Sequence, residues 1–161
     1  MKEKEIQDPY KTVFNNIEEL KGFIGKELGL TGWNEMDQER INKFADVTED
    51  LQWIHIDEER SKKESPYKQT IAHGFLILSL SSKIMFDCYE IKNASMAINY
   101  GLDKVRFPSA TISGSRFRGR VSLIEYLKIP KGAKYKLQVV IELEGLEKPA
   151  CVADCLALAY R

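Results

Sequence analysis

Residues 70–90, TIAHGFLILSLSSKIMFDCYE, are apolar almost throughout. Their large hydrophobic side chains fall on nearly every side of a helical projection: Phe75, Leu76, Ile77, Leu78, Leu80, Ile84, Met85 and Phe86. A run of about 17 apolar-rich residues without a turn residue exceeds normal strand lengths, which favours a helix. A helix that is apolar on most sides must be buried on most sides. We therefore predict one long, buried helix that organises the rest of the fold.

The chain after this helix has a strongly β pattern. Four partly alternating segments are separated by Gly, Pro and Ser clusters: 95–109, 115–130, 133–145 and 149–161. Strands that follow one another without intervening helices favour antiparallel pairing. The expected fold class is therefore α+β, with an antiparallel sheet wrapped around the long helix.

The N-terminal half has predicted helices of its own. Residues 8–24 offer Asp8 as an N-cap, Pro9 at the first helical position and apolar residues at helical spacing. Two further helices and one extended segment are expected over 36–48, 57–65 and 28–36. The length of 161 residues predicts one domain, 1–161, with a helical extension over 1–27.

Charge and composition exclude several classes of function. The 24 basic and 24 acidic side chains cancel, so no global field favours nucleic acid or an anionic membrane. The N-terminus lacks the apolar core of a secretory signal, and no apolar run reaches the roughly 20 residues that span a bilayer. We expect a cytoplasmic protein that binds neither nucleic acid nor membrane.

The cysteines agree with a reducing compartment. Their number, three, is odd and too small for a disulfide framework: Cys88, Cys151 and Cys155. Cys151 and Cys155 fall on one face of a predicted strand, where they could pack in the core or bind a metal. Neither histidine is near them in sequence, so core packing of reduced thiols is favoured.

The segment TEDLQWIH (48–55) places a carboxylate near an imidazole. Asp50 and His55 are five residues apart, so they diverge by about 140° on a helix and face opposite sides of a strand. They converge only if the segment is a curved loop or a helix end, which its polar sequence permits. Such a pair can move a proton near neutral pH. The structural alternative is that Asp50 caps a turn and His55 is an ordinary histidine.

The second histidine stands where the long helix begins, in IAHGF (71–75). The first N–H groups of a helix have no internal partner, and with the positive end of the dipole they suit a developing oxyanion. Gly74 lets a substrate carbonyl approach the backbone closely. His73 either caps the helix, contacts a ligand, or packs as a structural residue at the helix entrance.

These two pieces, D-x-x-x-I-H and then I-A-H-G-F, resemble the MaoC-like hydratase family. Its (R)-specific enoyl-CoA hydratases carry G-D-x-N-P-x-H and then a helix that opens with H-G. The similarity covers most of the chain, from about Gly29 to the end. The nodulation protein N-like subgroup of the family shares the motif Q-W-I-H. The resemblance implies a hot-dog fold, a long helix cradled by a curved antiparallel sheet, and a homodimer with active sites at the subunit interface.

The resemblance also implies roles for particular residues. Asp50 and His55 match the catalytic aspartate and histidine, and Gly74 matches the glycine whose N–H faces the thioester carbonyl. Ser82 falls near a serine that supports the site, although Ser79 and Ser81 compete for that place. The implied reaction is syn addition of water to a trans-2-enoyl thioester, or its reverse.

Two positions depart from the family pattern. Glu49 replaces the glycine before the aspartate, at a place where glycine is favoured for an unusual φ. Gln52 and Trp53 replace Asn-Pro, and Trp53 either fills part of a substrate pocket or packs into a gap in the core. These changes leave the acid–base pair intact and bear on substrate size.

A basic strand offers a possible site for the phosphates of coenzyme A. Arg116, Arg118 and Arg120 alternate with apolar or small residues and so share one face of a strand. Lys104 and Arg106 alternate likewise one segment earlier, and the Pro/Ser-rich link between the two segments suggests that they pair. The ordinary alternative is a solvated outer face of the sheet.

The leading hypothesis is a dimeric hydratase or dehydratase that acts on a coenzyme A or acyl-carrier-protein thioester. It needs no metal and no cofactor beyond coenzyme A as part of the substrate, and the chain has no P-loop or dinucleotide glycine motif. Two alternatives are an acyl-CoA thioesterase, since hot-dog proteins also hydrolyse thioesters, and a non-catalytic protein that binds acyl thioesters.

Overall fold

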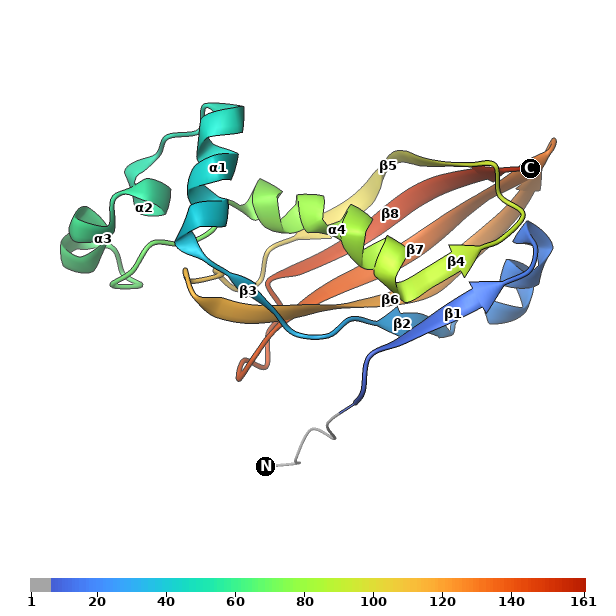
Figure 1. The fold of residues 1–161 in the computed structure, drawn as a ribbon, viewed down its shortest axis with the longest axis horizontal. Helices are drawn as coiled ribbons and strands as arrows, with labels where there is room; N and C mark the ends of the chain where they lie inside the picture. The colour runs from blue at the N-terminus through green and yellow to red at the C-terminus, as the bar shows by residue number, and fades with distance from the viewer. Residues whose placement is uncertain (1–6) are drawn as a thin grey trace.

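A computed structural model describes residues 7–161 and contains one continuous sheet (Figure 1). The strands follow the order β4 (Tyr89–Ile91), β1 (Tyr10–Phe14), β2 (Glu27–Leu30), β6 (Ser115–Ile129), β7 (Gly132–Leu143), β8 (Cys151–Tyr160) and β5 (Met96–Arg106), and β3 (Asn34–Met36) also pairs with β6. All pairs are antiparallel except β1 with β4. The α+β class with an antiparallel sheet is confirmed.

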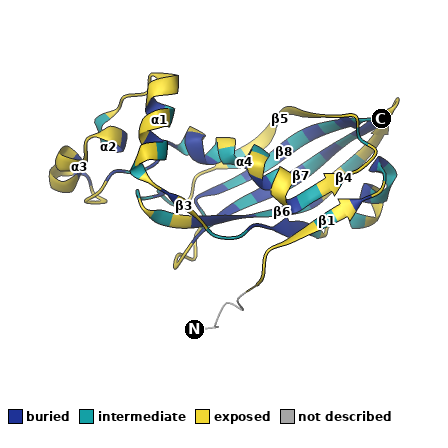
Figure 2. Cartoon of the chain, viewed as in Figure 1, coloured by how far each residue is buried: buried dark blue, intermediate teal, exposed yellow. Residues whose placement is uncertain are grey.

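Helix α4 (Gly74–Cys88) is the predicted long helix, and it lies along one face of the sheet (Figure 1). Its buried residues include Leu76, Ile77 and Ile84. The expected burial on most sides is wrong for the single chain, because Phe75 and Phe86 are 73% and 71% exposed. Figure 2 shows this exposed stripe along the helix. One chain therefore covers only the sheet-facing side of α4.

The central strands alternate as a half-covered sheet requires. Along β7 and β8 almost every second residue is buried, and the residues between them are half-buried. Cys151 and Cys155 fall on the buried side, and both are free, as is the buried Cys88. Core packing of the thiols is thus confirmed.

The predicted helix over 8–24 is wrong in its first part. Tyr10–Phe14 form strand β1, which pairs with β2 and β4, and a 3-10 helix, η1, follows over Ile17–Phe23. The Asn16 side chain accepts a hydrogen bond from Glu19 N and starts η1 there. The helical extension expected over 1–27 is therefore a sheet strand and a short helix as far as residues 7–27 are described, and residues 1–6 lie outside the described part.

Of the three short helices in the N-terminal half, the first and third were predicted from the sequence and the second was not. They are α1 (Gln38–Thr48), α2 (Trp53–Ile56) and α3 (Glu58–Glu64), and they gather at one end of the sheet near the start of α4 (Figure 1). Asp37 caps α1 and Asp57 caps α3 through their side chains. None of the helices in residues 7–161 is long and apolar enough to cross a membrane.

The predicted pairing of the two basic segments is wrong. β5 pairs only with β8 and forms an edge of the sheet, whereas β6 lies between β2 and β7. The link between β5 and β6 does not form a tight hairpin, because it pairs instead with the chain that leads into α4. Ala72 N donates to Thr111 O, and Ser113 N donates to Thr70 O. This link therefore braces the N-terminus of the long helix.

Candidate active site

Three side chains from separate parts of the chain meet beside the first turn of α4. Asp50 lies in the loop between α1 and α2, His55 lies in α2, and His73 directly precedes α4. One ligand atom from each lies within 4.8 Å of the others. The predicted convergence of Asp50 and His55 through a curved segment is confirmed, and His73 joins them.

His55 is held in one tautomer by its surroundings. Its Nδ1 lies 2.7 Å from Ile71 O, and because a carbonyl oxygen only accepts, Nδ1 carries the proton. Nε2 is therefore left with a lone pair. Burial disfavours the imidazolium and lowers the pKa of His55 below 6.5, despite the hydrogen bond to Ile71. The ring is thus neutral near pH 7 and can accept a proton at Nε2.

His73 is 2% exposed and lies beneath the His55 ring. The two ring centroids are 3.7 Å apart at an interplanar angle of 26°, so the rings are stacked. Its Nε2 lies 3.0 Å from Asp50 O, and its side chain makes no capping hydrogen bond to α4. His73 is thus the N-cap residue of α4 by position, but its side chain does not cap the helix. The predicted substrate contact gains no support, because the ring is buried.

Gly74 is the first residue of α4, so its N–H has no partner within the helix. A Cβ at this position would come within 3.3 Å of the Phe107 ring. Phe107 was not identified from the sequence, because its approach depends on the link between β5 and β6. The lack of a side chain at Gly74 lets the Phe107 ring pack against the backbone at the start of α4.

Both departures from the family pattern have a visible consequence. Glu49 ends α1 in the left-handed region, with φ 60° and ψ 18°, so the prediction of an unusual φ is confirmed. The guanidinium of Arg60 stacks over Trp53 at 4.4 Å from its ring centroid. Trp53 therefore packs between α2 and α3, which favours the packing interpretation over a pocket wall.

A groove of about 250 Å³ runs along α4 and starts at Phe75, the residue after Gly74. Its walls come from α4, β5 and β8: Phe75, Leu78, Ser79, Ser81, Ser82, Met85, Asn99, Leu102 and Cys155. All three candidate serines line it. Ser79 Oγ donates to Leu76 O, and the buried Ser81 Oγ has no partner among the described residues. Ser82 is half-buried and faces the groove.

The arginines of β6 lie on the outer face of the sheet and are paired with carboxylates. Phe117, Gly119 and Val121, which alternate with them, are buried, and a Cβ on Gly119 would meet Ile84 of α4. The pairs are Arg116 with Glu144, Arg118 with Glu142, and Arg120 with Glu27. Because the strand turns these side chains away from α4, the predicted contact of Arg116 and Arg118 with substrate gains no support.

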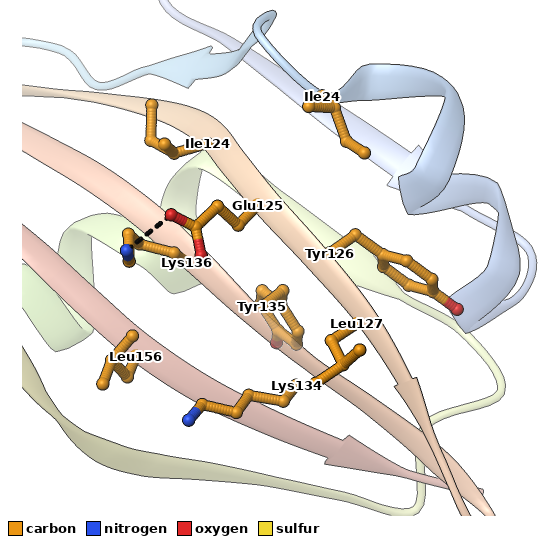
Figure 3. Close-up of a pocket in the computed structure, with 9 residues that line it drawn as sticks. All are labelled: Ile24, Ile124, Glu125, Tyr126, Leu127, Lys134, Tyr135, Lys136 and Leu156. Atoms are coloured by element: carbon orange, nitrogen blue, oxygen red, sulfur yellow. Dashed lines mark hydrogen bonds and ion pairs between the residues drawn. The ribbon is translucent and has the colours of Figure 1, made fainter.

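A second, larger cavity of about 490 Å³ lies on the sheet near η1, at the end away from α1–α3 (Figures 1 and 3). It is lined by Ile24, Ile124, Glu125, Tyr126, Leu127, Lys134, Tyr135, Lys136 and Leu156. One of its charged side chains, Lys136, forms ion pairs: its Nζ lies 2.6 Å from a Glu125 carboxylate oxygen and 2.8 Å from one of Asp103. The cavity has no histidine, so acid–base chemistry near neutral pH belongs to the Asp50 cluster.

The Asp50 cluster has donors that fit proton transfer and also fit a metal ion. One ligand atom from each of its three residues lies within 4.8 Å of the others. Each histidine has one nitrogen bonded to a backbone carbonyl, which fixes its tautomer and leaves the other nitrogen with a lone pair.

Comparison with known proteins identifies a family. Residues 19–142 match the family described as MaoC like domain. A 3-hydroxyacyl-thioester dehydratase Z from Mycobacterium tuberculosis is 40% identical over 144 residues, which cover 89% of this chain and 95% of the relative. A nodulation protein N from Rhizobium leguminosarum bv. viciae is 42% identical over 147 residues, which cover 89% and 90%.

Solved structures share the fold. A monoamine oxidase regulatory protein of Archaeoglobus has a TM-score of 0.76 at 21% identity, covering 92% of this chain and 96% of its own. An R-hydratase from Pseudomonas aeruginosa has a TM-score of 0.68 at 19% identity, covering 82% and 80%. At these identities the two structures establish the fold alone, and the expected hot-dog fold is confirmed.

Proposed function

The chain belongs to the MaoC-like dehydratase family, and on that basis we propose how this hydro-lyase works. Asp50 and His55 handle the protons, and the Gly74 N–H binds the carbonyl oxygen of an acyl thioester. The proposed substrates are trans-2-enoyl and (R)-3-hydroxyacyl thioesters, the class to which the name of the mycobacterial relative points. The acyl carrier is coenzyme A or acyl carrier protein.

One observation supports this proposal: a neutral imidazole and a carboxylate cluster with His73, the residue that precedes α4, whose N-terminus has no side-chain cap. His55 Nε2 has a free lone pair, and an Asp50 oxygen lies within 4.8 Å of the two histidines. The His55 ring stacks on His73, so it lies next to the residue that precedes the Gly74 amide. A water molecule held by the acid–base pair can then face a carbonyl bound at Gly74.

In the hydration direction, Asp50 and His55 orient one water molecule over the double bond. As the water oxygen bonds to C3, the π electrons of the C2–C3 bond move toward the thioester oxygen, and the pair takes a proton from the water. The Gly74 N–H and the helix dipole stabilise the resulting enolate-like oxygen. The pair then delivers a proton to C2. Dehydration is the reverse, so protons and the elements of water balance without a metal or redox cofactor.

The groove that starts at Phe75 is the proposed site of the acyl chain. It continues from the proposed carbonyl position along α4, and Leu78, Met85 and Leu102 give it apolar walls. Ser82 faces this groove, and we propose that it contacts the substrate, as expected from the sequence. Because Arg116 and Arg118 point away from α4, they are not assigned to the coenzyme A phosphates in this proposal.

A turnover assay with crotonyl-CoA tests the reaction. Loss of the enoyl absorbance without release of free thiol is the expected result, because water adds to the double bond and the thioester stays intact. Release of thiol would instead indicate a thioesterase. If purified protein binds the thioester and turns over neither bond, the non-catalytic alternative replaces the proposal.

The pH dependence of hydration should follow His55. A base must be neutral to act, and the neutral form persists above its pKa, which burial lowers from the ordinary value. We therefore expect kcat/KM to stay constant down to about pH 6.5 and to fall only in more acidic solution. A pH–rate profile between acidic and mildly alkaline buffers measures this. A half-loss of activity above that value would contradict the assignment of His55 as the base.

We also propose that the protein is a homodimer in a reducing cytoplasm. The edge strand β5 exposes Met96, Ile98, Tyr100 and Leu102, and α4 exposes Phe75 and Phe86. Apolar residues that follow an unpaired strand edge and an adjacent helix are typical of a surface covered by a second copy. Cys88, Cys151 and Cys155 are all free thiols, which agrees with a reducing compartment.

Charge placed on this surface should separate the dimer. Wild type is expected at twice the 18.5 kDa of one chain, and Ile98→Lys or Phe86→Glu at the mass of one chain. The reason is that burying an unpaired charge in an apolar interface makes association less favourable by roughly several kcal/mol. Light scattering after size exclusion gives the masses. Leu146→Lys is the matched control, because Leu146 is 49% exposed and belongs to the loop between β7 and β8 rather than to β5 or α4.

A further inference from the structure

We propose that His73 is a positioning residue that holds Asp50 and His55 in register with the Gly74 amide. The inference rests on the proposed function, because it assigns a role within the same site. With 2% of its surface exposed, the ring lies beneath the reacting groups rather than among them. Three contacts, each to a different member of the site, carry the assignment.

The first contact anchors the loop of Asp50. His73 Nε2 lies 3.0 Å from Asp50 O and must donate, since a carbonyl oxygen only accepts. The Asp50 carboxylate is 52% exposed, and its Oδ2 lies 4.0 Å from the same His73 nitrogen, beyond hydrogen-bond distance. The position of the carboxylate therefore depends on its backbone, and His73 is the side chain that fixes this backbone to the start of α4.

The second contact fixes the plane of the His55 ring. His73 stacks on it at 3.7 Å, and Phe44 of α1 lies against His73 with a centroid distance of 5.0 Å. The other constraint on His55 is the hydrogen bond from Nδ1 to Ile71 O. A ring that is held on one face and at one nitrogen has a single direction left for its Nε2 lone pair.

The third contact is covalent, since His73 immediately precedes Gly74. A residue at the N-cap commonly bonds the first free N–H groups of the helix with its own side chain. The His73 side chain makes no such bond, because it is turned toward Asp50 and His55. The same rotation thus anchors the acid–base pair and leaves the amide of Gly74 open to a substrate oxygen.

Two variants of the full-length protein separate the contacts. His73→Phe keeps a ring over His55 and loses the donor to Asp50 O, whereas His73→Gln keeps a donor and loses the ring. We expect each to lower kcat for crotonyl-CoA hydration roughly 10- to 100-fold, because small misplacements of reacting groups have effects of that size, with little change in KM. Ser61→Ala is the control, since Ser61 is buried in α3 with an unpartnered Oγ.

Thermal unfolding distinguishes positioning from a purely structural role. His73→Phe loses the hydrogen bond to Asp50 O but also removes the buried Nδ1, which has no partner among the described residues, so the two effects offset and we expect little change in the melting temperature. Lower kcat with unchanged stability supports the proposal. Wild-type kcat in both variants, or activity that falls only in step with stability, would overturn it. If wild type itself hydrates no enoyl thioester, the proposed function fails, and this assignment fails with it for that separate reason.

Discussion

Asp50→Asn should lower kcat/KM for enoyl-thioester hydration by about 10²- to 10⁴-fold, the range for loss of a positioned acid–base group. Asparagine has the same shape but cannot accept a proton from the water. Asp50 is 52% exposed and its backbone carbonyl keeps the bond to His73, so the fold should be unaffected. Steady-state kinetics with crotonyl-CoA and circular dichroism of the same sample give the two readouts.

The double variant provides a sharper test of the pair. His55→Ala should cause a loss of similar size, and adding it to Asp50→Asn should cause little further loss, because two groups that act on one water molecule act as a unit. Glu49→Gln is the matched control, since it changes the neighbouring exposed carboxylate to an amide. Losses that multiply, or a Glu49→Gln defect as large as that of Asp50→Asn, would indicate that the two residues do not share one proton-transfer step.

The sequence was informative wherever one local pattern determined the outcome. The length of the apolar run identified α4, and alternation identified the strands from β5 to β8. The odd spacing of Asp50 and His55 required a curved segment, and the structure provides one as a loop and a single helical turn. Glu49 was identified as a position of unusual φ because a glycine is expected there, and its φ is 60°.

The features of the fold and the site that could not be predicted from the sequence depend on contacts between distant segments. Tyr10–Phe14 fits a helical period, but pairing with β2 and β4 satisfies its backbone in the sheet. The exposed side of α4 was predicted to be core, because an apolar side chain in the sequence does not reveal whether its own chain covers it; Phe75 and Phe86 stay exposed. The stacking of His73 on His55 depends on how α2 and α4 meet, which no spacing along the chain encodes.

Gly29→Ala should cause a large loss of stability, about 3 kcal/mol in the free energy of unfolding. A Cβ on Gly29 of β2 would lie 2.3 Å from Cys88 O and 2.6 Å from Cys88 Cα, at the C-terminal end of α4. Both are backbone atoms, so the helix and the sheet must separate to admit the methyl group. Urea unfolding monitored by fluorescence measures the change, and Gly22→Ala, with nothing within 4 Å of its added Cβ, is the control.

A comparison with Gly119 identifies the cause of this loss. A Cβ on Gly119 of β6 would also approach within 2.3 Å of α4, but only the side chain of Ile84. Shortening that side chain in Gly119→Ala/Ile84→Ala should therefore recover part of the stability lost by Gly119→Ala. No change of the Cys88 side chain can move its carbonyl, so Gly29→Ala/Cys88→Ala should stay as unstable as Gly29→Ala. Equal recovery in both pairs would show that α4 shifts easily on the sheet, and a helix that shifts easily could not fix the Gly74 amide beside His55.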